Sequence, residues 1–231
     1  WSTQHGLQRP KGMTWKSDKA HGWMQRQRAW TLSQQMLIDS MFDDLRHAYG
    51  KKKRLEAHMA EELMKSPTWM KVLQICGIRH ITAFALAAII GDISRFRNAK
   101  KLVSYFGLNP KVNESGISRK SGRLAHNGRK DARHFLIQGA VAVLRLDPGT
   151  NRWARWGQRL SYRRGKHVAT IAVARKMLTA VWYLLRGFKP EVTEATPHIT
   201  IKLGKIAGAI GTQRLPKLGY DKRCDFIEEK I

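Results

Sequence analysis

The residues with the clearest capacity for chemistry lie between Gly107 and His134. Ser115 sits between Glu114 and Gly116, and three basic residues follow within eight positions: Arg119, Lys120 and Arg123. A serine hydroxyl can attack a phosphodiester when a base or a metal activates it and cations stabilise the added negative charge. Most serines in loops are simply solvated, so composition alone leaves both interpretations of Ser115 open.

Other catalytic or ligand-binding patterns find little support in the chain. Cys76 and Cys224 are far apart and follow no metal-ligand spacing, and the nine histidines are scattered. Three Gly-Lys pairs lack the second glycine and the Ser or Thr of a phosphate-binding loop. The acids Asp92, Asp131 and Asp147 form no evident cluster, so we expect this chain to bind no metal ion or other cofactor by itself.

The segment around Ser115 is too long to be a simple connection between helices. It separates two apolar, helix-like regions, whereas helix connections usually take two to eight residues. Its glycines and serines allow the backbone to approach a ligand closely, and its cations are spaced as phosphate contacts. We therefore predict a long basic catalytic loop, with Gly116 at the serine and Gly128 before the next helix.

The charge of the chain indicates a polyanionic partner. Its 231 residues carry 43 Lys or Arg against 17 Asp or Glu, a formal net charge of +26. Solubility needs a net charge of only about 2 to 8 in a small domain. We expect DNA or RNA as the partner and no membrane, because the most apolar window, Ile81 to Gly91, is too short to span a bilayer. Two unpaired cysteines fit a reducing, cytoplasmic location.

The pattern predicts a mainly α protein in four parts. Residues 1–32 form a basic connector, 33–66 a coiled-coil-type helix, 67–188 the principal domain and 189–231 a loosely ordered tail. In the long helix, Ser33 is a plausible N-cap. One apolar seam runs at spacings of three and four: Leu37, Met41, Leu45, Ala48, Lys52, Leu55, Met59 and Leu63. That seam fits packing within the domain, an antiparallel hairpin or a homo-oligomer through residues 33–65.

The segment Pro67 to Gly91 is typical of two short helices joined by a tight turn at Gly77. The pattern resembles a helix-hairpin-helix, whose turn offers N–H groups to a phosphate, although Arg79 replaces its usual second glycine. An ordinary buried helical hairpin fits equally. A further helix is expected between Asn98 and Gly107.

Two more helices are expected after the basic loop. One opens near Gly128 with Arg129, Lys130 and Arg133 in its first turns, and another follows from Val168 to Gly187. Between them, Trp153 to Lys166 interleaves aromatic residues with arginines. This segment fits either stacking on single-stranded nucleic acid or a short amphipathic helix anchored to the core.

Five blocks in fixed order resemble the C-terminal transposase domain of the bacterial insertion-sequence one-ten class, the bridge-RNA-guided DEDD/serine recombinases. The blocks span about seventy residues: Gly77 to Ala83, Gly91 to Phe96, Lys101 to Pro110, Ser115-Gly116, and Gly128 to Arg133. The resemblance is weaker in the flanking helices and does not cover the tail. Departures from the family pattern are Arg79 for Gly and Ala132 for Leu.

The resemblance implies a DNA transposase that acts by serine-mediated strand exchange. It makes Ser115 the nucleophile that becomes covalently linked to a DNA end. It also implies an N-terminal RNase H-like domain with four acidic ligands for Mg²⁺ before Trp1, so we expect this chain to be an N-terminally truncated form that is inactive alone. DNA and a guide RNA are the expected partners.

The phosphate-binding residues expected under this interpretation are Arg79, Arg119, Lys120, Arg123, Arg129, Lys130 and Arg133. The expected loop glycines are Gly77, Gly116 and Gly128. Two alternatives remain open: a DNA- or RNA-binding fragment without turnover, and a basic helical protein that acts in assembly.

Overall fold

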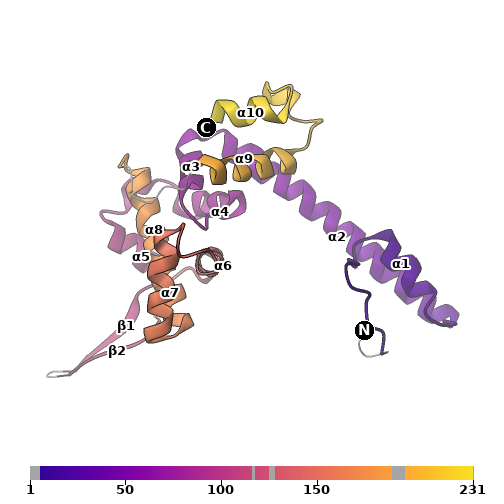
Figure 1. The fold of residues 1–231 in the computed structure, drawn as a ribbon, viewed down its shortest axis with the longest axis horizontal. Coiled ribbons are helices and arrows are strands. Elements are labelled where there is room, and N and C mark those ends of the chain that lie inside the picture. The colour runs from indigo at the N-terminus through magenta and orange to yellow at the C-terminus, as the bar shows by residue number, and fades with distance from the viewer. Residues whose placement is uncertain (1–5, 116–117, 125–127, 189–195, 231) are drawn as a thin grey trace. The chain divides into compact units, whose positions relative to one another are not determined.

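The computed structural model describes residues 6–115, 118–124, 128–188 and 196–230, and it is mainly α-helical (Figure 1). For residues 110–115, 118–124 and 196–197 it describes the backbone element only. The elements in order are α1 (Asp18–Gln25), α2 (Leu32–Met64), α3 (Pro67–Lys71), η1 (Val72–Gln74), α4 (His80–Ile90), η2 (Ile93–Arg95), α5 (Ala99–Tyr105), β1 (Pro110–Ser115), β2 (Ser118–Leu124), α6 (Lys130–Val143), α7 (Arg152–Arg164), α8 (Lys166–Leu185), α9 (Thr196–Ile210), η3 (Pro216–Leu218) and α10 (Arg223–Lys230).

The chain divides into two compact units, Trp1–Glu56 and Ala57–Ile231, and α2 contributes to both. This division differs from the four predicted parts, because the basic connector packs on the long helix. Its aromatic side chains join the first turns of α2 in a small core of buried residues: Ala20, Met24, Trp30, Ile38 and Phe42. Burial of aromatic rings provides most of the apolar contact available to so small a unit.

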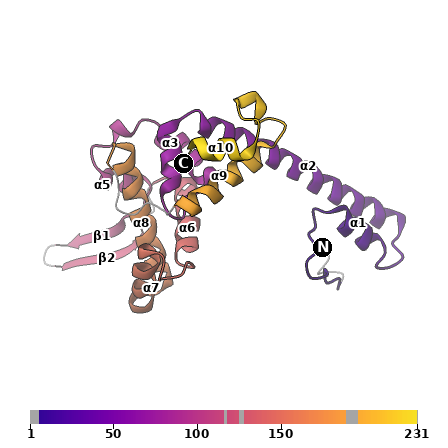
Figure 2. The same ribbon diagram turned by 45° about the horizontal axis from the view of Figure 1, so that its top comes forward.

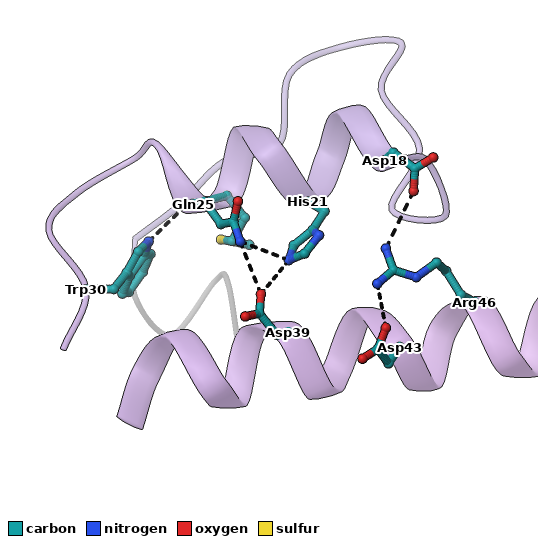
Figure 3. Close-up of polar contacts among 8 residues, drawn as sticks. Asp18, His21, Gln25, Trp30, Asp39, Asp43 and Arg46 are labelled. Atoms are coloured by element: carbon teal, nitrogen blue, oxygen red, sulfur yellow. Dashed lines mark hydrogen bonds and ion pairs between the residues drawn. The ribbon is translucent and has the colours of Figure 1, made fainter. Parts of the chain in front are cut away.

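Polar contacts fix α1 along α2 in the first unit (Figure 3). His21 Nε2 lies 2.6 Å from Asp39 Oδ1, and Gln25 Nε2 donates to the same oxygen at 3.2 Å. Arg46 reaches both Asp43, at 2.5 Å, and Asp18, at 3.5 Å. Because these groups are largely exposed, they contribute orientation more than stability.

The N-cap of α2 lies two residues before the predicted one. Thr31, rather than Ser33, closes the first turn: Gln34 N donates to Thr31 Oγ1 at 3.3 Å, and Thr31 N donates to Gln34 Oε1 at 3.1 Å. This reciprocal pair is a capping box, and it satisfies two backbone donors that the helix cannot satisfy itself. Ser33 lies inside the helix.

The second unit has α8 as its central helix, with α5, α6 and α7 packed against it (Figures 1 and 2). Its inner face is fully buried at Val173, Ala174, Met177, Leu178 and Val181. α6 is fully buried at Leu136, Ala140 and Val143. A helix flanked on several sides is apolar nearly all round.

By length and composition α8 is also the one helix of the described residues that could cross a membrane. Half of its apolar window is buried inside this unit, where other helices cover it.

Gly77 permits close contact between the turn before α4 and the middle of α6. It has φ +81°, and a Cβ built there would lie 2.7 Å from both Gly139 O and Val143 Cγ2. A side chain would therefore be strained by the backbone and blocked by its neighbours. The predicted turn glycine is required here by packing.

The predicted long loop contains two antiparallel strands. β1 pairs with β2, and the register sets Ser115 opposite Ser118 and Glu114 opposite Arg119, with an irregularity between Pro110 and Val112. The loop prediction was wrong for residues 110–115 and 118–124. Their sequences are rich in Ser, Lys and Arg and poor in the β-branched and aromatic residues that mark strands. The two strands are joined through their backbone N–H and C=O groups, and the residue types do not predict this pairing.

The predicted loosely ordered tail also requires correction. From Thr196 onward the chain forms α9, η3 and α10, and seven of its apolar side chains join the core of the second unit: Leu203, Ile206, Ala207, Ile210, Leu215, Tyr220 and Phe226. Gly204 and Gly208 made α9 hard to predict from sequence, because glycine lowers helix propensity. Burial of the apolar residues between them outweighs that cost.

Candidate active site and nucleic-acid interface

Ser115 is the last residue of β1, and the basic residues predicted to serve it lie on β2. In the register, Glu114 pairs with Arg119 and Asn113 with Lys120, while Arg123 lies near the other end of β2. Antiparallel pairing thus brings residues from both sides of the Ser115-Gly116 block onto one small sheet. Gly116 lies outside the described residues.

The two ends of the strand pair are held together where α5 stops and α6 starts. A Cβ on Gly128, which has φ +118°, would lie 2.6 Å from Gly107 N and 2.8 Å from Gly107 Cα. Arg129 N donates to Tyr105 O at 3.2 Å, and Arg133 Nη1 donates to Gly107 O at 3.1 Å. We call Tyr105, Gly107, Gly128, Arg129 and Arg133 the neck. The neck explains the requirement for glycine at 128.

Arg129 and Asp131 form an ion pair at the neck with two contacts. Arg129 Nε donates to Asp131 Oδ1 at 3.2 Å, and Nη2 donates to Oδ2 at 2.9 Å. These bonds lower the pKa of Asp131 from 3.8 to about 2, with further help from the Ala132 backbone N–H, and they raise the pKa of Arg129. The forked geometry suits a guanidinium and a carboxylate.

The neck changes the roles expected of two of three cations. The Arg129 side chain pairs with Asp131 while its backbone N–H bonds to Tyr105 O, and Arg133 donates to Gly107 O, so both residues contribute to the neck. Lys130 begins α6 and is exposed. The structure thus brings the predicted residues 129, 130 and 133 together at the base of the strand pair, but two of them perform structural work there.

Arg95 is a positioning residue beside the neck that residue types alone did not single out. Its guanidinium lies 5.0 Å from the ring centroid of Phe96 and 5.2 Å from that of Tyr105. Trp182 Nε1 donates to Phe96 O at 3.1 Å, which fixes this cluster to α8. Cation–π contacts of this kind orient a helix end. In the sequence, this cluster could have been found from the pair Arg95-Phe96, which comes shortly before a helix that ends at Tyr105.

Arg79, another predicted phosphate-binding residue, is not one of the residues that form the neck. It is exposed, serves as N-cap residue of α4 and makes no side-chain capping bond there. The turn of Gly77 and Arg79 is preceded by α3 and η1, which are shorter than the first helix the pattern predicts.

Comparison with known proteins identifies the segment that contains these features. Residues 70–154 match the family described as Transposase IS116/IS110/IS902. Residues 70–154 are therefore similar to a transposase domain of the IS110 class. The matched residues run from within α3 to the first turn of α7, so they include the turn at Gly77, the neck and both strands.

Several curated relatives bear names that agree with this family. A "Probable family 20 transposase" of Pseudomonas aeruginosa is 31% identical over 150 residues, 64% of this chain and 44% of the relative. The "Transposase for insertion sequence element IS1111A" of Coxiella burnetii is 33% identical over 116 residues, 50% of this chain and 32% of the relative. A "Pilin gene-inverting protein" of Moraxella lacunata is 34% identical over 118 residues, 50% of this chain and 36% of the relative. The chain spans less than half the length of these relatives.

The helix that follows the two strands and α6 adds a strongly basic surface to this transposase domain. α7 has five arginines and no acid, and its exposed positions recur every three or four residues at Arg152, Arg155, Arg159 and Arg163. Tyr162 is 95% exposed among them. Trp153 is buried, and Lys176 Nζ lies 4.3 Å from the ring centroid of Trp156. Two of the interleaved aromatics thus pack in the domain, whereas Tyr162 stands in solvent.

Three acidic residues of the second unit are engaged in local contacts. Among the residues that the structure describes, no three His, Cys, Asp or Glu side chains gather where they could hold a metal ion. Of the three acids considered from sequence, Asp92 accepts from Ser94, Asp131 pairs with Arg129 and Asp147 accepts from Thr150 N. The described residues therefore do not fit a Mg²⁺ site.

Proposed function

We propose that this chain is the serine-bearing part of an IS110-class transposase, and that Ser115 is the nucleophile in DNA strand exchange. One observation carries the proposal: within the segment that matches the family, Ser115 ends a strand whose partner strand holds Arg119, Lys120 and Arg123. The neck supports it, because a glycine contact and two hydrogen bonds, from Arg129 N to Tyr105 O and from Arg133 to Gly107 O, join both ends of the strands.

The chemical step forms one bond and breaks another at phosphorus. The Ser115 Oγ bonds to the phosphorus of a DNA phosphodiester, and one bridging P–O bond breaks. The hydroxyl proton passes to a base, and a proton is returned to the departing DNA oxygen, which becomes a free hydroxyl. The phosphate remains on Ser115 as a phosphoester, whose bond energy is available for rejoining to another strand. Arg119, Lys120 and Arg123 would stabilise the negative charge of the transition state.

Substitution of Ser115 tests the nucleophile directly. The full-length transposase that contains this chain would be incubated with DNA bearing its insertion-sequence ends, Mg²⁺ and any guide RNA. We expect Ser115→Ala to abolish a covalent protein–DNA adduct, because no Oγ remains to bond to phosphorus. The measurement is the denaturing-gel yield of labelled DNA attached to protein.

Ser118→Ala is the matched control for that experiment. Ser118 lies directly opposite Ser115 in the strand register, so its substitution makes the same chemical change one position across the pair. We expect adduct yield to persist in Ser118→Ala. An adduct that survives Ser115→Ala, or that is lost only with Ser118→Ala, excludes Ser115 as the nucleophile.

A nucleic-acid-binding role without turnover is the second candidate, and α7 favours it. A helix that exposes Arg152, Arg155, Arg159 and Arg163 on its open positions suits phosphate contacts, and Tyr162 suits base stacking. DNA and a guide RNA are the partners we propose for this surface. An active parent protein that forms the Ser115 adduct argues against a purely binding role.

We further propose that α2 pairs with a second copy of the chain. Its seam residues Leu37, Met41, Leu45 and Leu55 are 37 to 53% exposed. The helix is acidic at Asp43 and Asp44 and basic at 51–54, so an antiparallel second copy would set acids against bases. Complementary charges beside an apolar seam set orientation in coiled coils. A basic protein devoted to assembly would use this surface alone.

A further inference from the structure

A hollow of about 190 Å³ opens between the turn before α4, the C-terminal end of α6 and the first turns of α9. The side chains at its wall that matter for recognition are Arg79, Ala142, His198, Ile201, Lys202 and Lys205. The turn and α6 lie within the segment that matches the transposase family, whereas α9 lies beyond residue 154. The hollow therefore combines the family segment with the C-terminal helices.

The wall of the hollow is cationic. Arg79, Lys202 and Lys205 line it together with His198, and none of its described lining residues is acidic. Lys202 Nζ donates to Leu73 O at 2.6 Å and to Ile75 O at 2.9 Å. These two backbone carbonyls hold the ammonium group at the wall of the hollow. Arg79 and Lys205 are exposed.

Two helix ends of opposite polarity lie near the hollow. α4 begins immediately after Arg79, so its positive end lies beside that side chain. α6 ends at the hollow with its negative end, which would repel an anion. Gln158 Nε2 covers that end, because it donates to Leu144 O at 3.1 Å and to Leu146 O at 2.9 Å.

Apolar groups complete the hollow. Ala142, Val143, Leu146 and Ile201 line it beside the cations, and Ile201 is 59% exposed although it lies on a helix with a buried apolar face. A lining that combines apolar side chains with cations matches a nucleotide unit of a chain, whose sugar is less polar than its phosphate. Proteins hold nucleic-acid backbones with such combinations of Lys, Arg and helix N-termini.

We propose that this hollow binds a backbone phosphodiester of the nucleic acid on which the transposase acts, with Arg79, Lys202 and Lys205 around the phosphate. The C-terminal helices thereby have a function beyond completing the core: α9 supplies two of the three cations. The inference rests on the proposed nucleic-acid partner and is independent of the chemistry of Ser115.

The test removes one charge, and separately fills the space, in the 231-residue chain. Lys205→Gln takes away an exposed cation of the hollow, and Lys217→Gln removes the same charge from exposed η3 as its control. Ala142→Phe fills the hollow without changing net charge, and Ala88→Phe places the same ring at an exposed position of α4 as its control. Circular dichroism checks that each variant keeps its helical fold.

The readout is affinity for a short duplex DNA and for an RNA hairpin, measured from about 50 to 200 mM salt. With Lys205→Gln we expect the slope of log K against log salt on duplex DNA to weaken by about 0.9, and affinity at 0.1 M salt to fall roughly eightfold. We expect Ala142→Phe to weaken binding severalfold. Loss in the DNA arm assigns the phosphodiester to DNA, and loss in the RNA arm alone assigns it to RNA.

The outcomes separate this inference from the proposed function. If Lys205→Gln binds like Lys217→Gln, and Ala142→Phe like Ala88→Phe, the hollow takes no phosphate and the inference is overturned. A salt slope near zero for the unsubstituted chain overturns the nucleic-acid partner as well. Failure of the Ser115 adduct leaves the hollow unaffected, because its binding needs no covalent step.

Discussion

The two ends of α2 carry the same apolar spacing but meet different surroundings. In the first unit, Leu37, Met41, Leu45 and Leu55 on this helix are 37 to 53% exposed. After the division at Glu56, Ala57, Ala60 and Leu63 are at most 6% exposed. Spacing of three and four therefore predicted the helix along its whole length, whereas it did not determine which part enters a core.

The contrast shows what stabilises each unit. The second unit closes around α8 with large side chains at complete burial, such as Phe106, Leu136 and Phe226. The first unit has one small core, around Trp30 and Phe42. An apolar stripe exposed on a long helix is an interaction surface more often than an accident of composition.

The largest expected difference in the free energy of unfolding is between alanine substitutions of one glycine in each unit. Gly77→Ala places a methyl 2.7 Å from Gly139 O at φ +81°, so we expect it to lower the free energy of unfolding by about 2 to 4 kcal/mol. Gly50 lies within α2 with nothing within 4 Å of a built Cβ, so Gly50→Ala should stabilise by about 0.5 to 1 kcal/mol. Denaturant unfolding monitored by circular dichroism measures both.

Equal effects from the two alanines would contradict this picture. In particular, a Gly77→Ala chain as stable as the unsubstituted protein would mean that the turn and α6 do not approach each other as described. Gly77→Ala variants that fail to fold support the contact, provided that Gly50→Ala expresses normally.

The next largest effect compares two leucines on α2. Leu63 is 2% exposed and Leu55 is 53% exposed. Leu63→Ala should cost about 2 to 4 kcal/mol, because it leaves a cavity in the second unit. Leu55→Ala should change the stability of a single chain by about 0.5 kcal/mol or less. Chemical unfolding at low protein concentration checks both values.

Leu55→Ala also tests the proposed pairing of α2. If a second copy covers the seam, the substitution should shift sedimentation equilibrium toward the monomer, and the midpoint of unfolding should depend on protein concentration. A chain that sediments as a monomer at every concentration, with or without the substitution, rules out pairing through this face.

Much of the helical architecture followed from sequence because local rules and packing agreed. A helix was expected between Asn98 and Gly107, and the Asn98 side chain caps α5 by accepting from Lys101 N at 3.0 Å. Gly187 was expected to end the helix after Val168, and α8 stops at Leu185 with Gly187 at φ +89°. In both places one side chain or one backbone conformation decides where the helix ends.

The strands and the C-terminal helices were missed because distant contacts decide them. Residues 110–115 and 118–124 lack a strand-like apolar alternation, and their pairing depends on backbone bonds closed off at Gly107 and Gly128. Phe226 is fully buried, but the residues that cover it lie elsewhere in the chain. The candidate site was similar: sequence supplied Ser115 and its cations, whereas the structure supplied the neck and the bonds of Arg129 and Arg133.

The smallest expected effect on stability comes from the solvent-exposed Arg129–Asp131 ion pair of the second unit. The pKa of Asp131 falls from 3.8 to about 2 through its bonds with Arg129, so the folded chain holds this carboxylate more firmly than the unfolded chain. The resulting stabilisation is present above the ordinary pKa and is lost as the pH falls from about 4 toward 2. Asp131→Asn should flatten that part of the pH dependence and change stability little at neutral pH, since the pair is solvent-exposed.

Titration of the Asp131 carboxyl by NMR measures the pair itself. We expect a midpoint near 2 in the unsubstituted chain and a shift upward in Arg129→Gln, because the guanidinium no longer holds the charged form. If the Asp131 carboxyl titrated at the ordinary aspartate pKa in both proteins, Arg129 would not stabilise its charged form. The neck would then form without this ion pair. The ends of the strands would then be held by Gly128 against Gly107 and by Arg133, and the second unit would depend on burial even at the base of its candidate site.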